Sequence, residues 1–208
     1  MNIKVVNNQL SDAFINSNES KNLKINNLDL DGYNIRFVYV GANYKHKNLN
    51  ILGEVFHKIR IENNIKITLV LTMSNSDYDL LGDLTKQFCQ NIGYAKPEDL
   101  QYLYKKIDAM IFPSLLECFS ISPIEAMYCK IPILCSDRVF IREFCNDVPF
   151  YFEPNDINSI KRSILQFQKQ RQNLYSRLNK GKKLSELYSC STKRSLSYLE
   201  LLKLPKYK

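Results

Sequence analysis

The sequence predicts an α/β fold in which a parallel sheet of about six strands carries helices on both faces. Short runs rich in β-branched and aromatic residues alternate with longer segments of helical periodicity along the 208 residues. Some of the short runs, such as 109–112, are apolar throughout, as expected of strands buried on both faces. Strands that alternate with helices imply right-handed crossovers, and therefore parallel strands.

The expected strands are short and apolar. They cover residues 36–41, 65–71, 90–93, 108–112, 131–135 and 148–152. In open parallel sheets, ligands bind beyond the carboxyl ends of the strands. We therefore expect one crevice to be lined by the loops after Val40, Leu71, Ile92, Phe112 and Cys135.

Helices are expected between and after these strands. Leu49, Leu52 and Val55 are spaced for one helical face, and Pro97 stands at a tolerated first-turn position. The expected helices cover residues 49–59, 77–88, 97–104, 122–129, a long basic stretch at 156–180 before Gly181, and 191–202. The Asn-, Ser- and Asp-rich residues 9–34 are expected to form a loop or linker.

These elements suggest three parts. We expect an N-terminal segment and linker at 1–34, a sheet domain at 35–188, and a C-terminal helix with a basic tail at 189–208. No apolar run approaches the roughly 20 residues that span a bilayer, and the N-terminus has no signal-peptide core, so we expect a cytoplasmic protein. The six cysteines form no metal-ligand grouping, which favours reduced, mostly buried thiols. Neither a metal nor a cofactor is expected.

The formal net charge is +8, and its excess is concentrated late in the chain. The basic residues are either solvated helix faces or a surface that meets anionic lipid headgroups. The second interpretation would place the protein peripherally at the inner face of a membrane. No nucleic-acid-binding motif accompanies the charge, so nucleic acid is not expected as a partner.

The stretch 117–127 carries the main functional signal. Glu117 lies in the loop after the strand 108–112, and Glu125 lies within the first turns of the next helix. The start of a helix suits a phosphate, and a nearby carboxylate can accept hydrogen bonds from sugar hydroxyls. Together these features suit a nucleoside diphosphate sugar. The plainer alternative is that Glu125 only complements the helix dipole.

Two other strand exits carry weaker signals. Gly41 permits a tight turn and is followed by Lys45, His46 and Lys47, which suit a diphosphate but also an ordinary basic loop. The pair 93–94 ends another strand at the same crevice. It either offers backbone contacts to a base or forms a plain turn.

In this setting, the segment 112–127 resembles a known family pattern. The segment contains Glu117, Glu125, Ala126 and Met127. The pattern is that of the C-terminal, nucleotide-sugar-binding domain of family-4 retaining glycosyltransferases with the GT-B fold. The likeness runs nearly end to end, through residues 41–48, 92–94, 98–104, 132–137, 142–143 and 151–156. It implies a Rossmann-like domain, one half of a GT-B enzyme.

The resemblance implies a role for each matching residue. Glu125 would bind the ribose hydroxyls, and Glu117, near the donor sugar, would act with Lys47 as a catalytic residue. Lys47 would neutralise charge on the leaving diphosphate, and the backbone N–H groups of Ile121 and Ser122 would meet the distal phosphate. The other expected donor-site residues are Gly41, Gly93, Tyr94, Phe119 and Ser120.

The chain departs from the family pattern at three positions. Ala42 stands where many relatives carry arginine, so one diphosphate contact is missing. Cys118 and Ser120 replace glycines, and the serine narrows the approach of the sugar.

Residues 4–8 resemble the start of the second domain of such enzymes, just after the hinge. We therefore expect the donor-binding half of a glycosyltransferase that moves a sugar from a nucleoside diphosphate sugar to a polysaccharide or lipid-linked glycan. The N-terminal acceptor domain would then come from a separate chain. The alternative is a non-catalytic nucleotide-sugar-binding module or a degenerate remnant.

Overall fold

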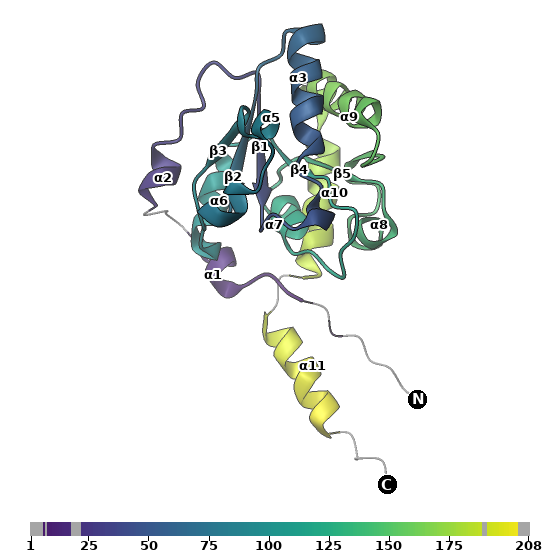
Figure 1. The fold of residues 1–208 in the computed structure, drawn as a ribbon. Coiled ribbons are helices and arrows are strands. Elements are labelled where there is room, and N and C mark those ends of the chain that lie inside the picture. The colour runs from purple at the N-terminus through teal and green to yellow at the C-terminus, as the bar shows by residue number, and fades with distance from the viewer. Residues whose placement is uncertain (1–5, 7, 18–21, 189–190, 204–208) are drawn as a thin grey trace.

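The computed structural model describes residues 6, 8–17, 22–188 and 191–203 (Figure 1). A sheet of six parallel strands forms its centre, which confirms the expected α/β, Rossmann-like architecture. The strands are β1 (Ile35–Val40), β2 (Ile67–Thr72), β3 (Cys89–Asn91), β4 (Ala109–Phe112), β5 (Ile133–Ser136) and β6 (Phe150–Phe152). Their spatial order is β3-β2-β1-β4-β5-β6. The direction of strand progression therefore reverses between β1 and β4, the pair whose register includes Phe37 opposite Ala109.

Helices cover both faces of the sheet (Figure 1). One layer holds α3 (Ile51–Asn63), which contacts α5 (Asp83–Lys86) and α9 (Ile157–Gln170). Helix α10 (Tyr175–Glu186) contacts α7 (Ser122–Tyr128) and α8 (Val139–Cys145) in the other layer. The remaining helical elements are α1 (Asp12–Ile15), α2 (Leu23–Asn26), η1 (Lys45–Lys47), α4 (Asn75–Asp79), α6 (Pro97–Lys105), η2 (Arg171–Asn173) and α11 (Ser191–Lys203).

Buried aromatic rings join strand β1 to the first helix layer. The Phe37 ring is stacked on the Phe56 ring of α3, with centroids 5.9 Å apart. It also lies 6.2 Å from the Phe167 ring of α9. Because these rings are buried, their packing fixes β1, and with it the loop that leaves its carboxyl end.

The expectation of a loop at 9–34 is wrong in part. Helices α1 and α2 lie there, and the side chains of Leu10, Phe14 and Ile25 are fully buried in the core. The Phe14 ring packs edge-on against Tyr104, and the Leu10 N–H donates to the Tyr188 carbonyl over 2.7 Å. Three apolar residues at irregular spacing show no periodicity, yet tertiary packing buries them. The hinge-like resemblance at 4–8 lies largely outside the described residues.

Three helix predictions need correction. The segment 77–88 forms two short helices, α4 and α5, separated near Gly82. The segment 156–180 is also divided, because the 3₁₀ turn η2 separates α9 from α10. Gly181 lies inside α10 rather than after a helix. A Cβ atom there would stand 3.0 Å from Val148 Cγ1 and 3.3 Å from Met127 Cγ, so glycine allows α10 to lie close against α7.

The carboxyl ends of the strands lie at one end of the molecule (Figure 1). Helix α11 extends from this end, away from the rest of the domain (Figure 1). The expected helix at 191–202 is thereby confirmed, whereas residues 189–190 and the basic tail at 204–208 lie outside the described residues. The loops of the expected crevice therefore open toward α11.

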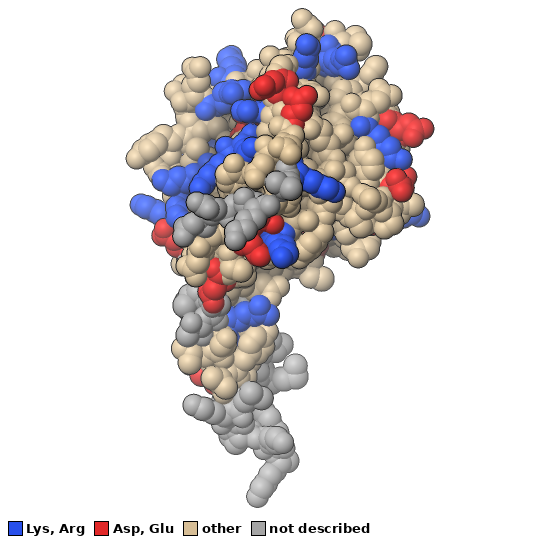
Figure 2. Space-filling view, turned by 90° about the vertical axis from the view of Figure 1, so that its left-hand side faces the viewer, with Lys and Arg blue, Asp and Glu red and all other residues tan. Residues whose placement is uncertain are grey.

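Basic side chains gather on the face that Figure 2 presents, with acidic side chains among them. Several lysines and arginines form ion pairs: Lys161 with Glu62, Lys180 with Asp147 and Arg138 with Glu153. Part of the positive excess is thus neutralised locally. Both interpretations of the charge, solvated helix faces and a lipid-facing surface, stay predictions.

Candidate functional site

The candidate site lies at the reversal point of the sheet, between the carboxyl ends of β1 and β4. In folds of this strand order, the reversal point opens a crevice in which ligands bind. The β1 exit leads to Lys47, and the β4 exit leads to Glu117. The two expected catalytic residues therefore come from the two strands that flank this point.

The loop after β1 has a defined shape. Gly41 adopts φ +139°, which side-chain-bearing residues rarely adopt, and the Tyr39 hydroxyl donates to the Ala42 carbonyl over 3.1 Å. At the far end of the loop, Asn48 is left-handed and its amide donates to the Pro154 carbonyl over 2.8 Å. These contacts hold the turn η1, whose last residue is Lys47.

The β1 and β4 exit loops are joined to each other. The Leu115 N–H donates to the His46 carbonyl over 2.7 Å. One residue after His46 and two residues after Leu115, Lys47 Nζ lies 2.5 Å from Glu117 Oε1. The two side chains are only 15% and 10% exposed. The structure therefore places one cation against one carboxylate at the reversal point.

Helix α7 starts directly behind this pair. Ile121 is its N-cap residue, and the Ser122 hydroxyl donates to the Val40 carbonyl over 3.4 Å. Ser120 and Ser122 are buried, and Ile121 is half-buried. The start of α7 is thus tied to the carboxyl end of β1, where a diphosphate held by Lys47 would lie.

Glu125 is buried in the first turn of α7, with 6% of its surface exposed. The Tyr104 hydroxyl of α6 donates to Glu125 Oε2 over 3.3 Å. Burial raises the pKa of Glu125 to about 7, and the hydrogen bond from Tyr104 offsets only part of this rise. A buried carboxyl group with a raised pKa beside a crevice is a functional-site candidate.

Gly93 and Tyr94 lie at the exit of β3. Gly93 has φ +77°, and its N–H donates to Asn91 Oδ1 over 3.2 Å. The Met73 N–H donates to the same oxygen over 3.3 Å, so Asn91 links the exits of β2 and β3. Tyr94 is 76% exposed, and Lys24 Nζ lies 3.5 Å from where a Cβ of residue 93 would be.

Phe119 turns toward α8 and the end of α10. Its ring lies 5.4 Å from the Phe144 ring and 6.0 Å from the Tyr188 ring. Cys118, beside it, is exposed, whereas Cys135 and Cys145 are buried and Cys89 and Cys129 are half-buried. These five cysteines are free thiols, and Cys190 lies outside the described residues.

The structure thus brings Lys47 into contact with Glu117 and places Ser122 beside the β1 exit. Glu125 contacts Tyr104 instead. Sequence reasoning missed the hydrogen bond from Tyr104 of α6 to Glu125 and the position of Lys24 of α2 beside Gly93. Tyr104 had one usable signal, since a tyrosine on an apolar helix face needs a partner for its hydroxyl. Lys24 had none.

The described residues contain neither a metal-ligand group nor a membrane-spanning helix. No group of three or more His, Cys, Asp or Glu side chains in the described ranges is arranged to hold a metal ion. Within the same ranges, no helix has the length and apolar character needed to cross a membrane.

Comparisons with known proteins bear on the family and the fold of the chain. The sequence model of the family described as "Glycosyl transferases group 1" matches residues 20–184. O-antigen chain mannosyltransferase B of Escherichia coli is 29% identical over 135 residues, which are 62% of this chain and 35% of that protein. The chain therefore spans about a third of the length of this relative.

Solved structures share the fold. A glycosyltransferase from Rickettsia africae superposes with a TM-score of 0.75 at 15% identity, covering 97% of this chain and 58% of that one. TarM from S. aureus, solved in complex with UDP, superposes with a TM-score of 0.65 at 18% identity over 86% of this chain and 38% of that one. The architecture is that of a Rossmann-like domain of GT-B type. Since the family match covers most of its length, the chain belongs to the glycosyl transferases group 1 family.

Proposed function

We propose that this chain is the C-terminal, donor-binding half of a family-4 retaining glycosyltransferase. It would move a hexose from a nucleoside diphosphate sugar to a polysaccharide or lipid-linked glycan. The observation that carries the proposal is the contact of Lys47 with Glu117 at the reversal point of the sheet. The mannosyltransferase relative and the UDP complex of TarM support a nucleotide-sugar donor.

Each group has a chemical task in this proposal. Departure of a nucleoside diphosphate leaves negative charge on the leaving oxygen, and a fixed cation with N–H donors lowers the energy of that charge. Lys47 supplies the cation, and the backbone at Ile121 and Ser122 supplies the donors. When the diphosphate binds, the Lys47 ammonium group pairs with it instead of with Glu117. The Glu117 carboxylate then faces the donor sugar.

Glu125 is the proposed anchor for the ribose. Its buried carboxyl oxygens can accept hydrogen bonds from two neighbouring hydroxyls. The site has the chemistry for binding a donor, whereas exclusion of water during transfer requires a second domain that closes over it. An N-terminal acceptor domain is the partner we propose for this step. Contact of the basic C-terminal helices with a membrane stays a prediction.

Calorimetric titration of the chain with UDP, GDP and ADP tests the proposal. We expect one of the three to bind, and Lys47→Met to weaken that binding because the diphosphate loses its cation. Lys161→Met is the matched control, since Lys161 pairs with Glu62 on α3, outside the proposed site. The absence of binding to all three nucleotides by well-folded protein would refute the proposal. Binding without transfer in the presence of a complementary domain would favour a non-catalytic module.

A further inference from the structure

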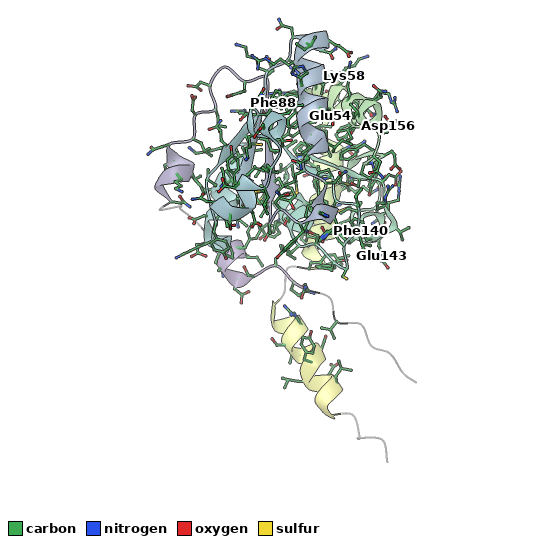
Figure 3. The ribbon with its side chains drawn as sticks, viewed as in Figure 1. Glu54, Lys58, Phe88, Phe140, Glu143 and Asp156 are labelled. Carbon is green, nitrogen blue, oxygen red and sulfur yellow. The ribbon has the colours of Figure 1, made fainter. Side chains whose placement is uncertain are left out.

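A hollow adjoins the loop that carries Glu117. It has a volume of about 490 Å³. Four segments meet around it: the N-terminal segment, the Glu117 loop, α8 and the end of α10. Its lining includes Asn8, Cys118, Phe119, Phe140, Glu143 and Tyr188. Figure 3 shows Phe140 and Glu143 near α8, at the end of the molecule toward which the strands' carboxyl ends point.

One wall of this hollow is aromatic. The Phe119 ring is wedged between Phe144 and Tyr188, with centroid distances of 5.4 and 6.0 Å, and Phe140 adds a fourth ring. The face of an aromatic ring is electron-rich. It therefore packs well against the C–H groups on the apolar face of a pyranose.

Polar groups also line the hollow. Glu143 is exposed, and no hydrogen bond or ion pair engages it among the described residues. Its carboxylate can accept hydrogen bonds from hydroxyl groups, and the Asn8 amide can both donate and accept them. A lining that combines aromatic rings with a carboxylate and an amide matches a ring with one apolar face and a rim of hydroxyls.

Other ligand classes fit less well. Among the residues that the structure describes, no Lys or Arg lines the hollow, so a phosphate or nucleotide would meet Glu143 without a compensating cation from them. An acyl chain would leave Glu143 and Asn8 without partners. The volume lies in the range of ordinary small-molecule pockets, so a hexose fits without distortion.

We propose that this hollow is a subsite for a hexose of the acceptor glycan. The assignment rests on the proposed function and extends it. The proposed diphosphate and ribose contacts, Lys47 and Glu125, are absent from the lining. Cys118 and Phe119 directly follow Glu117, so a sugar in the hollow lies next to the donor sugar while the diphosphate occupies Lys47. Phe119 is then shared between the two sites.

Methyl α-D-mannopyranoside is the probe, followed by ligand-observed NMR on the full chain. We expect weak binding that Glu143→Gln and Phe140→Leu each reduce about five- to tenfold, the loss of one hydrogen bond to a charged group or of one stacking contact. Glu54→Gln is the matched control, because Glu54 is an exposed glutamate on α3, away from the hollow and not part of its lining (Figure 3). It should leave the affinity unchanged.

Nucleotide titrations separate the two proposals. If a nucleoside diphosphate binds but the mannoside does not, or binds equally to all variants, the subsite is refuted and the donor site stands. If the mannoside binds and no nucleotide does, the donor assignment fails instead. A nucleotide sugar that displaces the mannoside, where the nucleoside diphosphate alone does not, would refute the acceptor assignment and give the hollow to the donor sugar.

Discussion

Carboxylates at the two ends of the parallel strands, here called the amino edge and the carboxyl edge of the sheet, have different hydrogen-bond partners. At the amino edge, Asp108 accepts hydrogen bonds from the Arg36 backbone N–H, Nε and Nη2 at 2.8, 2.9 and 2.8 Å. Burial on its own would raise the pKa of Asp108, but the hydrogen bonds and charge of Arg36 outweigh it and hold the pKa below its ordinary value. This carboxylate clamps β1 to β4.

At the carboxyl edge, Glu125 is more deeply buried but has a tyrosine instead of an arginine as its partner. Its pKa is raised to about 7. Glu117 makes a single contact with Lys47, without the fork that Arg36 provides. The carboxylate at the amino edge thus has three hydrogen bonds from one arginine, whereas each carboxylate at the carboxyl edge has a single contact described above.

The largest expected effect comes from Glu125→Gln. In the folded chain the pKa of Glu125 is about 7, against an ordinary value of 4.5, so the folded state holds this proton more tightly than the unfolded state. Stability from this group is therefore present below pH 4.5 and is lost as the pH rises to about 7. The glutamine keeps the Tyr104 hydrogen bond without the charge. It should stabilise the protein at pH 8 by up to about 3 kcal/mol.

Urea unfolding of both proteins at pH 5 and pH 8 measures this difference. The gain should be larger at pH 8 than at pH 5. An equal gain at both values would mean that the carboxyl group is not the source. The same variant should bind nucleoside diphosphate more weakly, because a ribose hydroxyl loses a charged acceptor.

The second effect is at the other edge. Asp108→Asn should lower the free energy of unfolding by about 2 kcal/mol, because Arg36 keeps a weaker, neutral partner. Nucleotide affinity of the folded variant should not change. A loss of nucleotide binding without a loss of stability would reverse the roles assigned to the two edges.

The third effect is expected for Lys47→Met. Stability should change less than in Asp108→Asn, since Glu117 has one contact with Lys47, whereas Asp108 accepts three hydrogen bonds from Arg36. Affinity for nucleoside diphosphate should fall about tenfold or more, as for the loss of one charged hydrogen bond. Parallel calorimetry and urea unfolding give both quantities. A stability loss that matches Asp108→Asn, with unchanged affinity, would make Lys47 a structural residue.

The smallest effect is expected for Arg171→Gln. Its Nη2 lies 3.5 Å from Asp108 Oδ1, and its side chain is 40% exposed. Exposed pairs of this kind contribute about 0.5 kcal/mol or less. A urea midpoint clearly below that of the parent chain would show that Arg171, and not only Arg36, belongs to the clamp.

Local sequence patterns located the sheet because its strands are apolar runs bounded by turns. They missed α8, whose seven residues are too few for a periodic signal. They merged α9 with α10, because the turn at Arg171–Asn173 contains neither glycine nor proline. The N-terminal apolar residues show their burial only in the folded chain.

The candidate site likewise combines features that local patterns predict with contacts that form only on folding. Lys47 and Glu117 could be placed at one crevice because both follow strands of a parallel sheet. Tyr104 reaches Glu125 from a helix 21 positions earlier, and no local spacing predicts that contact. Their roles in binding stay predictions that the variants above test.

Gly181 has a consequence for how the donor site could be tuned. Glycine inside a helix costs about 0.5–1 kcal/mol relative to alanine, yet here it lets α10 lie against Met127 of α7. The start of α7 is the proposed phosphate site, so its position is set partly from behind by a residue that no donor would touch. A methyl group at position 181 would displace α7 from its present position. In the proposed function, donor affinity could therefore be changed by a substitution on α10 while every binding side chain is kept.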